Sequence, residues 1–194
     1  MKTVPILFRV LCAVLVMGCS PQEDRPSHTP SGSAAEAMPA TRPAFSLIER
    51  GELLPVGAVA PDFELLDHLG RPFRLSAHRG RPVVLVFYPK DFTPGCTKQL
   101  CAIRDDWSQF EAKNLVVAGV NPGPVEEHRR FAEDHAFPFP VLCDPDQRVA
   151  GAYGCKGASG LPSRTVYVID ADGRIAMARS GMPANSEILA SVAR

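Results

Sequence analysis

The sequence has no excess of charge of either sign and no internal repeats. Its 194 residues include 21 Lys and Arg against 21 Asp and Glu, so the formal net charge is zero. A protein that binds nucleic acid through surface charge needs an excess of basic side chains, so the balance argues against that class. The length predicts one folded domain with additional segments.

The first eighteen residues are typical of an export signal. Lys2 and Arg9 come first, and residues 10–17 form an uncharged apolar stretch that is too short to span a bilayer as a helix. We therefore predict that residues 1–18 are a signal peptide. An ordinary secretory signal without a lipid, or a misread start of the chain, is the alternative.

A cysteine follows this signal directly. The segment Val16-Met-Gly-Cys19-Ser resembles a lipobox, where a bacterial lipoprotein is cleaved before a cysteine that is then diacylated. The resemblance implies that Cys19 carries the lipid and anchors the protein to a membrane of the cell envelope, facing the periplasm or extracytoplasmic space. Cys12 would be removed with the signal and has no role.

Residues 19–54 are predicted to form a disordered tether. Five prolines interrupt this tract, which is rich in Ser, Ala and Glu and has few large side chains to bury. The folded domain is therefore predicted to span residues 55–194.

The stretch from Tyr88 to Cys101 contains the candidate chemistry. The apolar run 83–88 is typical of a buried strand, and Pro94-Gly-Cys96-Thr then opens an amphipathic segment. Its apolar residues at helical spacing are Leu100, Ile103, Trp107 and Phe110. Cys96 is thus expected in the first turn of a helix, where N–H groups without helical partners and the helix dipole favour a thiolate.

The spacing of Cys96 and Cys101 argues against a permanent disulfide. Five positions along an intact helix place two Cα atoms about 8.6 Å apart, whereas a disulfide needs roughly 4.4–6.8 Å. A bond between the two cysteines therefore requires the first turns of the helix to unwind. This favours a transient redox pair.

The motif Pro89-x-x-x-Thr93-x-x-Cys96 resembles the active-site signature of the peroxiredoxins, the thiol peroxidases of the AhpC/TSA superfamily. The second cysteine five residues later is similar to the bacterioferritin comigratory protein, or PrxQ, branch. The resemblance implies that Cys96 attacks a peroxide and that Cys101 then resolves the oxidised cysteine in an intramolecular disulfide. A buried helix cysteine without a role is the alternative for Cys101.

The same resemblance assigns roles to three further residues. Thr93 would bind the peroxide and orient the thiolate, and Pro89 would shield the pocket from water. Arg164 matches the family's second-site arginine, whose guanidinium would hold Cys96 ionised and stabilise charge on the oxygens. The alternatives are that Thr93 caps the helix backbone and that Arg164 is a solvated surface residue.

The order of the predicted elements indicates the α/β class. Strands are expected at residues 62–66, 72–75, 83–88, 115–120, 140–142, 165–169 and 175–178, and helices after Pro94 and at 125–135, 147–153 and 185–194. Strand–helix alternation, a hairpin turn at Asp170-Ala-Asp-Gly173 and a last helix predict a mixed sheet covered by helices. This order resembles the thioredoxin-like fold of the peroxiredoxins over residues 55–194.

Two further cysteines depart from the family, in which Ser and Val are more usual around these places. Cys143 and Cys155 could form a structural disulfide in an oxidising compartment. Inert core thiols are the alternative, and Cys155 is also a second candidate for resolving Cys96. Four histidines in polar segments are expected to be solvated: His28, His68, His78 and His128.

Other functions of thioredoxin-like proteins fit these residues less well. A copper chaperone pairs two closely spaced cysteines with a late histidine, whereas the last histidine here is His135. A thioredoxin-type oxidoreductase needs Cys-x-x-Cys, which is absent. A non-catalytic module on a tether would not need Thr93, Cys96 and Arg164 together.

The sequence therefore predicts a membrane-tethered peroxidase that needs no metal, haem or flavin. Its expected substrates are hydrogen peroxide and organic hydroperoxides, including lipid hydroperoxides. The reductant is expected to be an extracytoplasmic thiol protein of the thioredoxin type. A monomer is expected, because a resolving cysteine on the same helix needs no partner chain.

Overall fold

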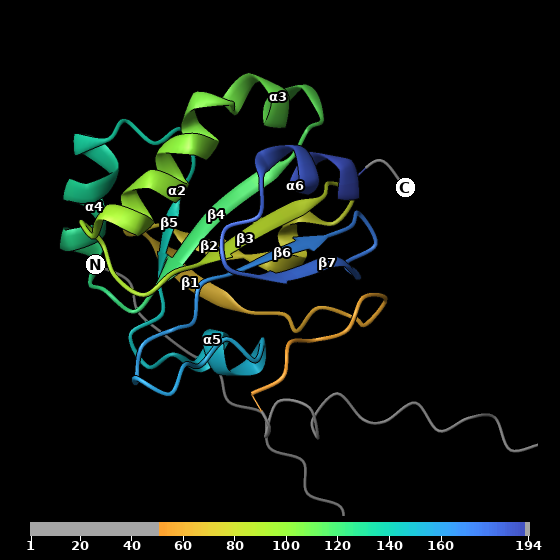
Figure 1. The fold of residues 1–194 in the computed structure, drawn as a ribbon, viewed down its shortest axis with the longest axis horizontal. Coiled ribbons are helices and arrows are strands. Elements are labelled where there is room, and N and C mark those ends of the chain that lie inside the picture. The colour runs from red at the N-terminus through yellow and green to blue at the C-terminus, as the bar shows by residue number, and fades with distance from the viewer. Residues whose placement is uncertain (1–50, 193–194) are drawn as a thin grey trace, which may run out of the picture. The chain divides into compact units, whose positions relative to one another are not determined.

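A seven-stranded mixed sheet forms the centre of the folded region in the computed structural model, which describes residues 51–192 (Figure 1). The strand order is β2-β1-β5-β4-β3-β6-β7. In chain order the strands are β1 (Glu64–Asp67), β2 (Pro72–Arg74), β3 (Val83–Phe87), β4 (Val116–Asn121), β5 (Val141–Cys143), β6 (Thr165–Ile169) and β7 (Ile175–Ser180). The central strands β5, β4 and β3 are parallel, and the outer strands pair antiparallel.

Helices cover both faces of this sheet, as Figure 1 shows. They are the 3-10 helix η1 (Leu75–His78) and the α-helices α2 (Pro94–Asp105), α3 (Trp107–Ala112), α4 (Val125–Asp134), α5 (Arg148–Ala152) and α6 (Asn185–Ser191). Helices α2, α3, α4 and α6 lie over one face, and α5 lies over the other. The predicted α/β architecture is confirmed, and the expected elements fall within a few residues of the observed ones.

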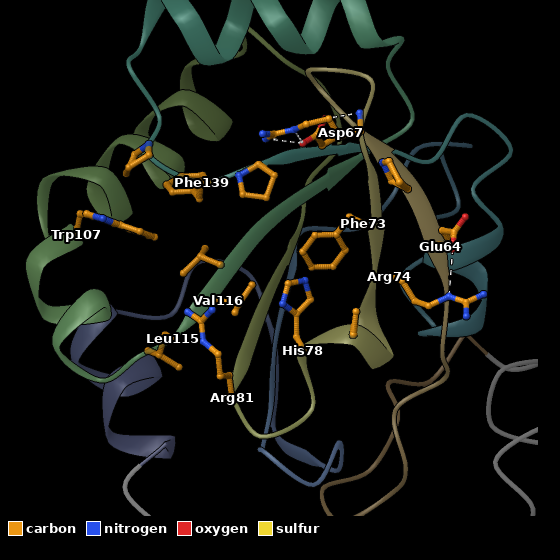
Figure 2. A pocket seen from close by; sticks show the side chains of 16 residues that line it. Glu64, Asp67, Phe73, Arg74, His78, Arg81, Trp107, Leu115, Val116 and Phe139 are labelled. Carbon is orange, nitrogen blue, oxygen red and sulfur yellow. Dashed lines mark hydrogen bonds and ion pairs between the residues drawn. The ribbon is translucent and has the colours of Figure 1, made fainter.

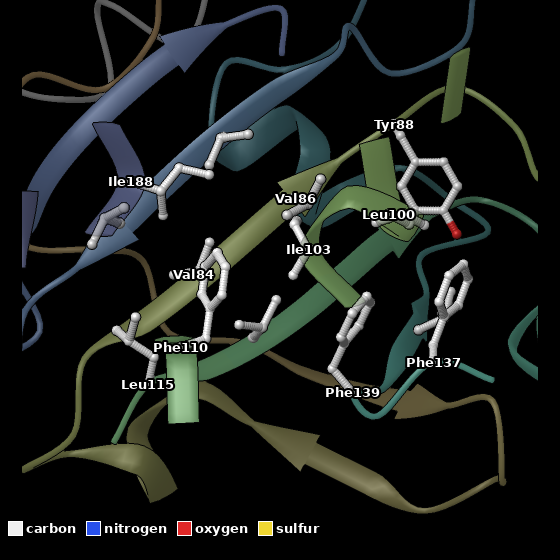
Figure 3. Close-up of a cluster of buried hydrophobic side chains, with 14 of the residues drawn as sticks. Val84, Val86, Tyr88, Leu100, Ile103, Phe110, Leu115, Phe137, Phe139 and Ile188 are labelled. Atoms are coloured by element: carbon white, nitrogen blue, oxygen red, sulfur yellow. The ribbon is translucent and has the colours of Figure 1, made fainter. Parts of the chain in front are cut away.

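The two faces of β3 show why this strand is wholly apolar. Val84 and Val86 pack into a core with α2, α3 and α6, which Figure 3 shows from close by. Val83, Leu85 and Phe87 point to the opposite side and pack into a second core. Successive side chains of a strand point to opposite faces, so a strand buried on both faces has no polar position. β3 is therefore a rigid support for the segment that follows it.

The amphipathic segment after Pro94 is divided into two helices, because α2 ends at Asp105 and α3 begins at Trp107. Asp106 lies between them, and its carboxylate accepts hydrogen bonds from the side-chain amides of Gln109 and Asn185. Short polar side chains that bond locally compete with the helical backbone pattern. The break separates the Cys96 helix from the helix that carries Phe110.

The folded core begins slightly before the predicted boundary at Pro55. Leu54 is buried, and its N–H donates to the hydroxyl of Tyr167, at 2.9 Å. The predicted signal peptide, Cys19 and nearly all of the predicted tether lie outside the described residues. None of the helices in residues 51–192 is both long and apolar enough to cross a membrane.

Candidate active site

Cys96 lies in the first turn of α2, directly after the carboxyl end of β3. Thr93 is the N-cap residue and Pro94 is the first residue of the helix. Pro fits this position because its fixed φ suits a helix and its missing N–H would have no partner there. The side chain of Cys96 is fully buried, with an exposed fraction of 0%. The thiol is therefore held in an apolar surrounding at the positive end of a helix.

A guanidinium group reaches this thiol from the other half of the chain. Arg164 Nη2 lies 3.4 Å from Cys96 Sγ and donates to it. The sheet register explains the contact, because Thr165 at the start of β6 pairs with Phe87 at the end of β3. Arg164 is half-buried and faces the sulfur, so it is not the solvated surface residue of the alternative interpretation.

Two residues that position Arg164 were not predicted from the sequence. Gln99 is buried, and its Oε1 accepts a hydrogen bond from Arg164 Nη1, at 2.9 Å. It lies three positions after Cys96 and hence on the same side of the helix. A Cβ atom at Gly95 would come within 3.0 Å of Arg164 Nη2, so this glycine gives the guanidinium room to approach. The i, i+3 spacing of Cys96 and Gln99 is the signal that could have found Gln99.

Thr93 and Pro89 lie where the motif predicts, in the segment between β3 and α2. The hydroxyl of Thr93 donates to the carbonyl of Lys90, at 3.0 Å, and makes no side-chain cap to the helix. The capping alternative is therefore wrong for its side chain. The carbonyl of Thr93 instead accepts from the N–H of Thr97, at 2.9 Å. Pro89 follows β3 after Tyr88 and is half-buried.

Cys101 lies on the same helix as Cys96 and is half-buried against the core around α2. Both are free thiols. The helix is unbroken from Pro94 to Asp105, so the structure shows the two cysteines in the arrangement in which no bond can form between them.

The segment that carries the motif is anchored by a buried carboxylate. Asp91 accepts a hydrogen bond from the hydroxyl of Tyr88, at 2.7 Å, and its other oxygen lies 2.6 Å from His128 Nδ1. Phe92, the next residue, has φ 56°, a left-handed conformation that is unusual for a bulky side chain. This turn lets Asp91 point into the protein while Thr93 takes the N-cap position of α2.

The expectation that His128 is solvated was wrong. Its side chain is fully buried, because the apolar face of α4 turns it toward Asp91. Burial alone would lower the pKa of His128, but the hydrogen bonds and charges of Asp91 and Cys143 outweigh it and raise the pKa to about 9. His68 and His78 are half-buried, and His28 lies outside the described residues.

Cys143 and Cys155 are free thiols as well, so the structure contains no disulfide between them. Cys143 ends β5, and Cys155 follows α5 within the second core. Burial raises the pKa of Cys155 to about 12, with a smaller opposing effect from a hydrogen bond to Thr165. These properties fit an inert core thiol at Cys155.

A cavity of about 580 Å³ lies far along the sheet from Cys96, at the amino ends of β3 and β4 (Figure 2). Trp107, Phe139 and Leu115 line it, but none of the predicted site residues does. Two of its arginines are paired with carboxylates, Arg71 with Asp67 and Arg74 with Glu64. No cysteine lines it, so the thiol chemistry is assigned to Cys96.

Potential metal ligands do not gather elsewhere in the part of the chain that the structure describes. Within residues 51–192, no group of three or more His, Cys, Asp or Glu side chains is placed to hold a metal ion. The functional groups of the Cys96 site are its own thiol, the Arg164 guanidinium, the Thr93 hydroxyl and the Gln99 amide.

The profile of the AhpC/TSA family matches residues 56–178, which include every predicted residue around Cys96. This chain belongs to the AhpC/TSA family. Among AhpC/TSA proteins it is 41% identical over 119 residues to the chloroplastic peroxiredoxin Q of Sedum lineare, and the match covers 60% of this chain and 64% of that protein. The match to rice peroxiredoxin Q covers 55% of that protein, so the chain spans less than two thirds of these plant relatives.

Bacterial members of the AhpC/TSA family match over more of their length. Peroxiredoxin Bcp of Bacillus subtilis is 38% identical over 128 residues, which cover 62% of this chain and 81% of that protein. The crystal structure of peroxidoxin BcpB from Mycobacterium tuberculosis superposes with a TM-score of 0.65 at 37% identity, covering 70% of this chain and 94% of that one. These similarities confirm the predicted thioredoxin-like fold and the predicted branch of the family.

Proposed function

We propose that this protein is a thiol peroxidase in which Cys96 is the peroxidatic residue. The observation that carries the proposal is the contact of Arg164 Nη2 with Cys96 Sγ, 3.4 Å long, at the first turn of α2. A buried thiol is inert unless a nearby cation and helix N–H groups stabilise its anion. Here both are present at one sulfur. The names of the peroxiredoxin relatives support the same reaction.

The first step follows from this geometry. The Cys96 thiolate attacks the terminal oxygen of a peroxide, the O–O bond breaks, and the product is a sulfenic acid with water or an alcohol. Negative charge develops on the leaving oxygen, and the Arg164 guanidinium is held beside the sulfur by Gln99 to stabilise it. The hydroxyl of Thr93 donates a hydrogen bond to the carbonyl of Lys90, so its oxygen is left to accept a hydrogen bond from the O–H of the peroxide.

Resolution by Cys101 is the second step. After the first turns of α2 unwind, the Cys101 sulfur attacks the sulfenic acid, and a disulfide and a second water result. Cys101 lies toward the surface of the helix and packs only partly against the core, which supports this role. A dithiol protein of the thioredoxin type would then reduce the disulfide and restore both thiols.

The experiment is site-resolved peptide mapping of the reduced full-length chain after one equivalent of hydrogen peroxide. We expect loss of the free thiol at Cys96 and a peptide linking Cys96 to Cys101. The Cys101→Ser variant is the matched control and should stop at the sulfenic acid. A link from Cys96 to Cys155 would overturn the resolving assignment alone, whereas an unreacted Cys96 would favour a thioredoxin-like module without peroxidase activity.

We also propose that the protein works at a membrane of the cell envelope through a lipid on Cys19. The support is the lipobox-like sequence that ends the predicted signal. Two or more acyl chains hold a protein at a membrane far more firmly than one. Mass spectrometry of the membrane fraction should find a mature chain that begins at a lipid-modified Cys19. An unmodified Cys19 or a different mature start would contradict the proposal.

A further inference from the structure

A second cluster of reactive side chains lies where three parallel strands end. Asp91 follows β3, Asn121 ends β4 and Cys143 ends β5, and the pairing of β4 with β5 places Asn121 beside Cys143. Helix α4 adds His128 to this group. The carboxyl ends of parallel strands are where α/β proteins commonly bind ligands. This cluster shares no side chain with the proposed peroxide site.

The contacts of His128 indicate a cationic ring. Nδ1 lies 2.6 Å from Asp91 Oδ2, and Nε2 lies 3.3 Å from the carbonyl oxygen of Asn121. A carboxylate and a carbonyl can only accept, so both ring nitrogens are hydrogen-bonded when both carry protons. Because Asn121 pairs with Cys143 across β4 and β5, the ring also lies close to this thiol, and Cys143 is among the groups that raise the pKa of His128. A buried cation thus adjoins the thiol.

Cys143 is accessible in a way that Cys155 is not. Its exposed fraction is 8%, against 0% for Cys155. It borders a cavity of about 450 Å³ next to Gly123 and Leu66, which is large enough for a small organic molecule. The charged residues around this cavity are Glu64, Asp144, Asp146 and Arg148. The titratable groups around His128 are Asp91, Tyr88, His68 and Cys143.

We propose that Cys143 is a second reactive thiol of this protein, a site of modification by low-molecular-weight disulfides. A thiol beside an imidazolium that a carboxylate orients has the arrangement of an activated nucleophile. The Cys143 sulfur attacks one sulfur of the disulfide, a new S–S bond forms, and the old one breaks. The other half leaves as a thiolate and takes up the proton of the thiol, so the exchange balances without a further oxidant.

A disulfide suits this cavity better than a peroxide does. Breaking an O–O bond generates an alkoxide or hydroxide, which requires a donor aimed at the leaving oxygen, as Arg164 is at Cys96. A thiolate is a much weaker base than an alkoxide or a hydroxide, so it leaves without such a donor. The cavity also leaves room for the half of the disulfide that stays attached.

The test uses the full-length chain with Cys96→Ser and Cys101→Ser, so that it does not depend on the proposed peroxidase. The probe is 4,4′-dithiodipyridine, and mass spectrometry of peptides gives the rate at each cysteine. At pH 7 we expect Cys143 to react at least tenfold faster than Cys155. Equal rates, or a faster reaction at Cys155, would overturn the proposal.

A second variant separates activation by His128 from mere exposure of the thiol. At pH 7, His128→Gln should slow the reaction of Cys143 at least about fivefold relative to Cys155, because the cation beside the thiol is lost. Urea unfolding of the variant shows whether it is folded. An unchanged rate at Cys143 in the folded variant would contradict the inference by itself.

Discussion

Arg164 divides its hydrogen bonds between the sulfur of Cys96 and the side chain of Gln99. Arg164→Ala removes both the charge and the planar fork, and we expect the second-order rate constant with hydrogen peroxide to fall at least about 100-fold. Gln99→Ala leaves the charge but frees the guanidinium, and a loss of about tenfold is expected. Competition kinetics against a reference peroxidase measures both. Equal losses in the two variants would show that Gln99 does more than orient Arg164.

Thr93 is a second residue whose role the structure makes testable. Thr93→Val keeps the shape but removes the oxygen, so we expect a loss of peroxidase activity of about tenfold or more. Thr93→Ser keeps the oxygen and should retain most of the activity. Because the hydroxyl does not cap α2, neither change should lower the free energy of unfolding by more than about 1 kcal/mol. A large loss of stability in Thr93→Val would contradict this assignment.

The Asp91–His128 pair predicts a pH dependence of stability. The pKa of His128 is raised from its usual 6.5 to about 9 in the folded state. The stabilisation is therefore fully present below pH 6.5 and is lost as the pH rises through about 9. We expect the free energy of unfolding, measured with urea under reducing conditions, to decline between pH 6.5 and 9.5 by about 1–3 kcal/mol relative to His128→Gln. If the free energy of unfolding changed with pH in the same way in both proteins, the charged pair would be ruled out.

At the scale of elements, the C-terminal half of α2 is anchored, whereas its first turns must unwind in the proposed resolution step. Asn185, the first residue of α6, donates from Nδ2 to the carbonyl of Ala102 and to the carboxylate of Asp106. These contacts begin one residue after Cys101. They hold the second half of the helix while the first turns unwind in the proposed resolution step.

Replacing this anchor should loosen the second half of α2. For Asn185→Ala we expect amide exchange in α2 to be up to about fivefold faster, because a lost hydrogen bond is worth about 1 kcal/mol. Hydrogen exchange followed by mass spectrometry measures this. The exposed neighbour Ser186 provides the control, since Ser186→Ala should leave exchange in α2 unchanged. Unaltered exchange in Asn185→Ala would contradict the anchoring role.

The elements differ in how readily the sequence predicts them. The run that became β3 is apolar throughout, and β6 is apolar after its first residue, Thr165. The strand from Thr165 to Ile169 was predicted without error, because burial on both faces leaves an unambiguous pattern. The division of the Cys96 helix at Asp106 depends on contacts with Gln109 and Asn185. Apolar periodicity carries no information about such bonds.

The candidate site shows the same division. Cys96, Thr93 and Pro89 form a contiguous motif and could be found from spacing, and the meeting of Arg164 with Cys96 was expected from family resemblance. Gln99 was missed although its i, i+3 spacing from Cys96 is visible in the sequence, whereas His128 was missed because its role comes from a tertiary partner. A histidine among charged neighbours on α4 is expected to be solvated, and only the position of Asp91 in the fold shows that it is buried.

For the molecule as a whole, the proposed cycle couples redox state to stability. Cys96 and Leu100 are fully buried in the core around α2, and forming the disulfide must draw this turn out of it. The oxidised protein should therefore unfold at a temperature at least about 5 °C lower than the reduced protein, if about 2 kcal/mol of packing is lost. Scanning calorimetry with and without one equivalent of peroxide gives the comparison. Cys101→Ser should not show the shift, and an oxidised form as stable as the reduced one would contradict it.

Both outer edges of the sheet are protected against pairing with strands of other molecules. β2 has only three residues, beginning with Pro72 and ending with the charged Arg74. At the other edge, the backbone of Ile175 in β7 is already bonded to Gly57 and Ala58, at 2.8 and 2.9 Å. Long unpaired edges invite strands of neighbouring molecules, and the danger is greatest when a core opens. If the proposed cycle opens the core at each turnover, these edges protect the exposed state from aggregating edge to edge with neighbouring molecules.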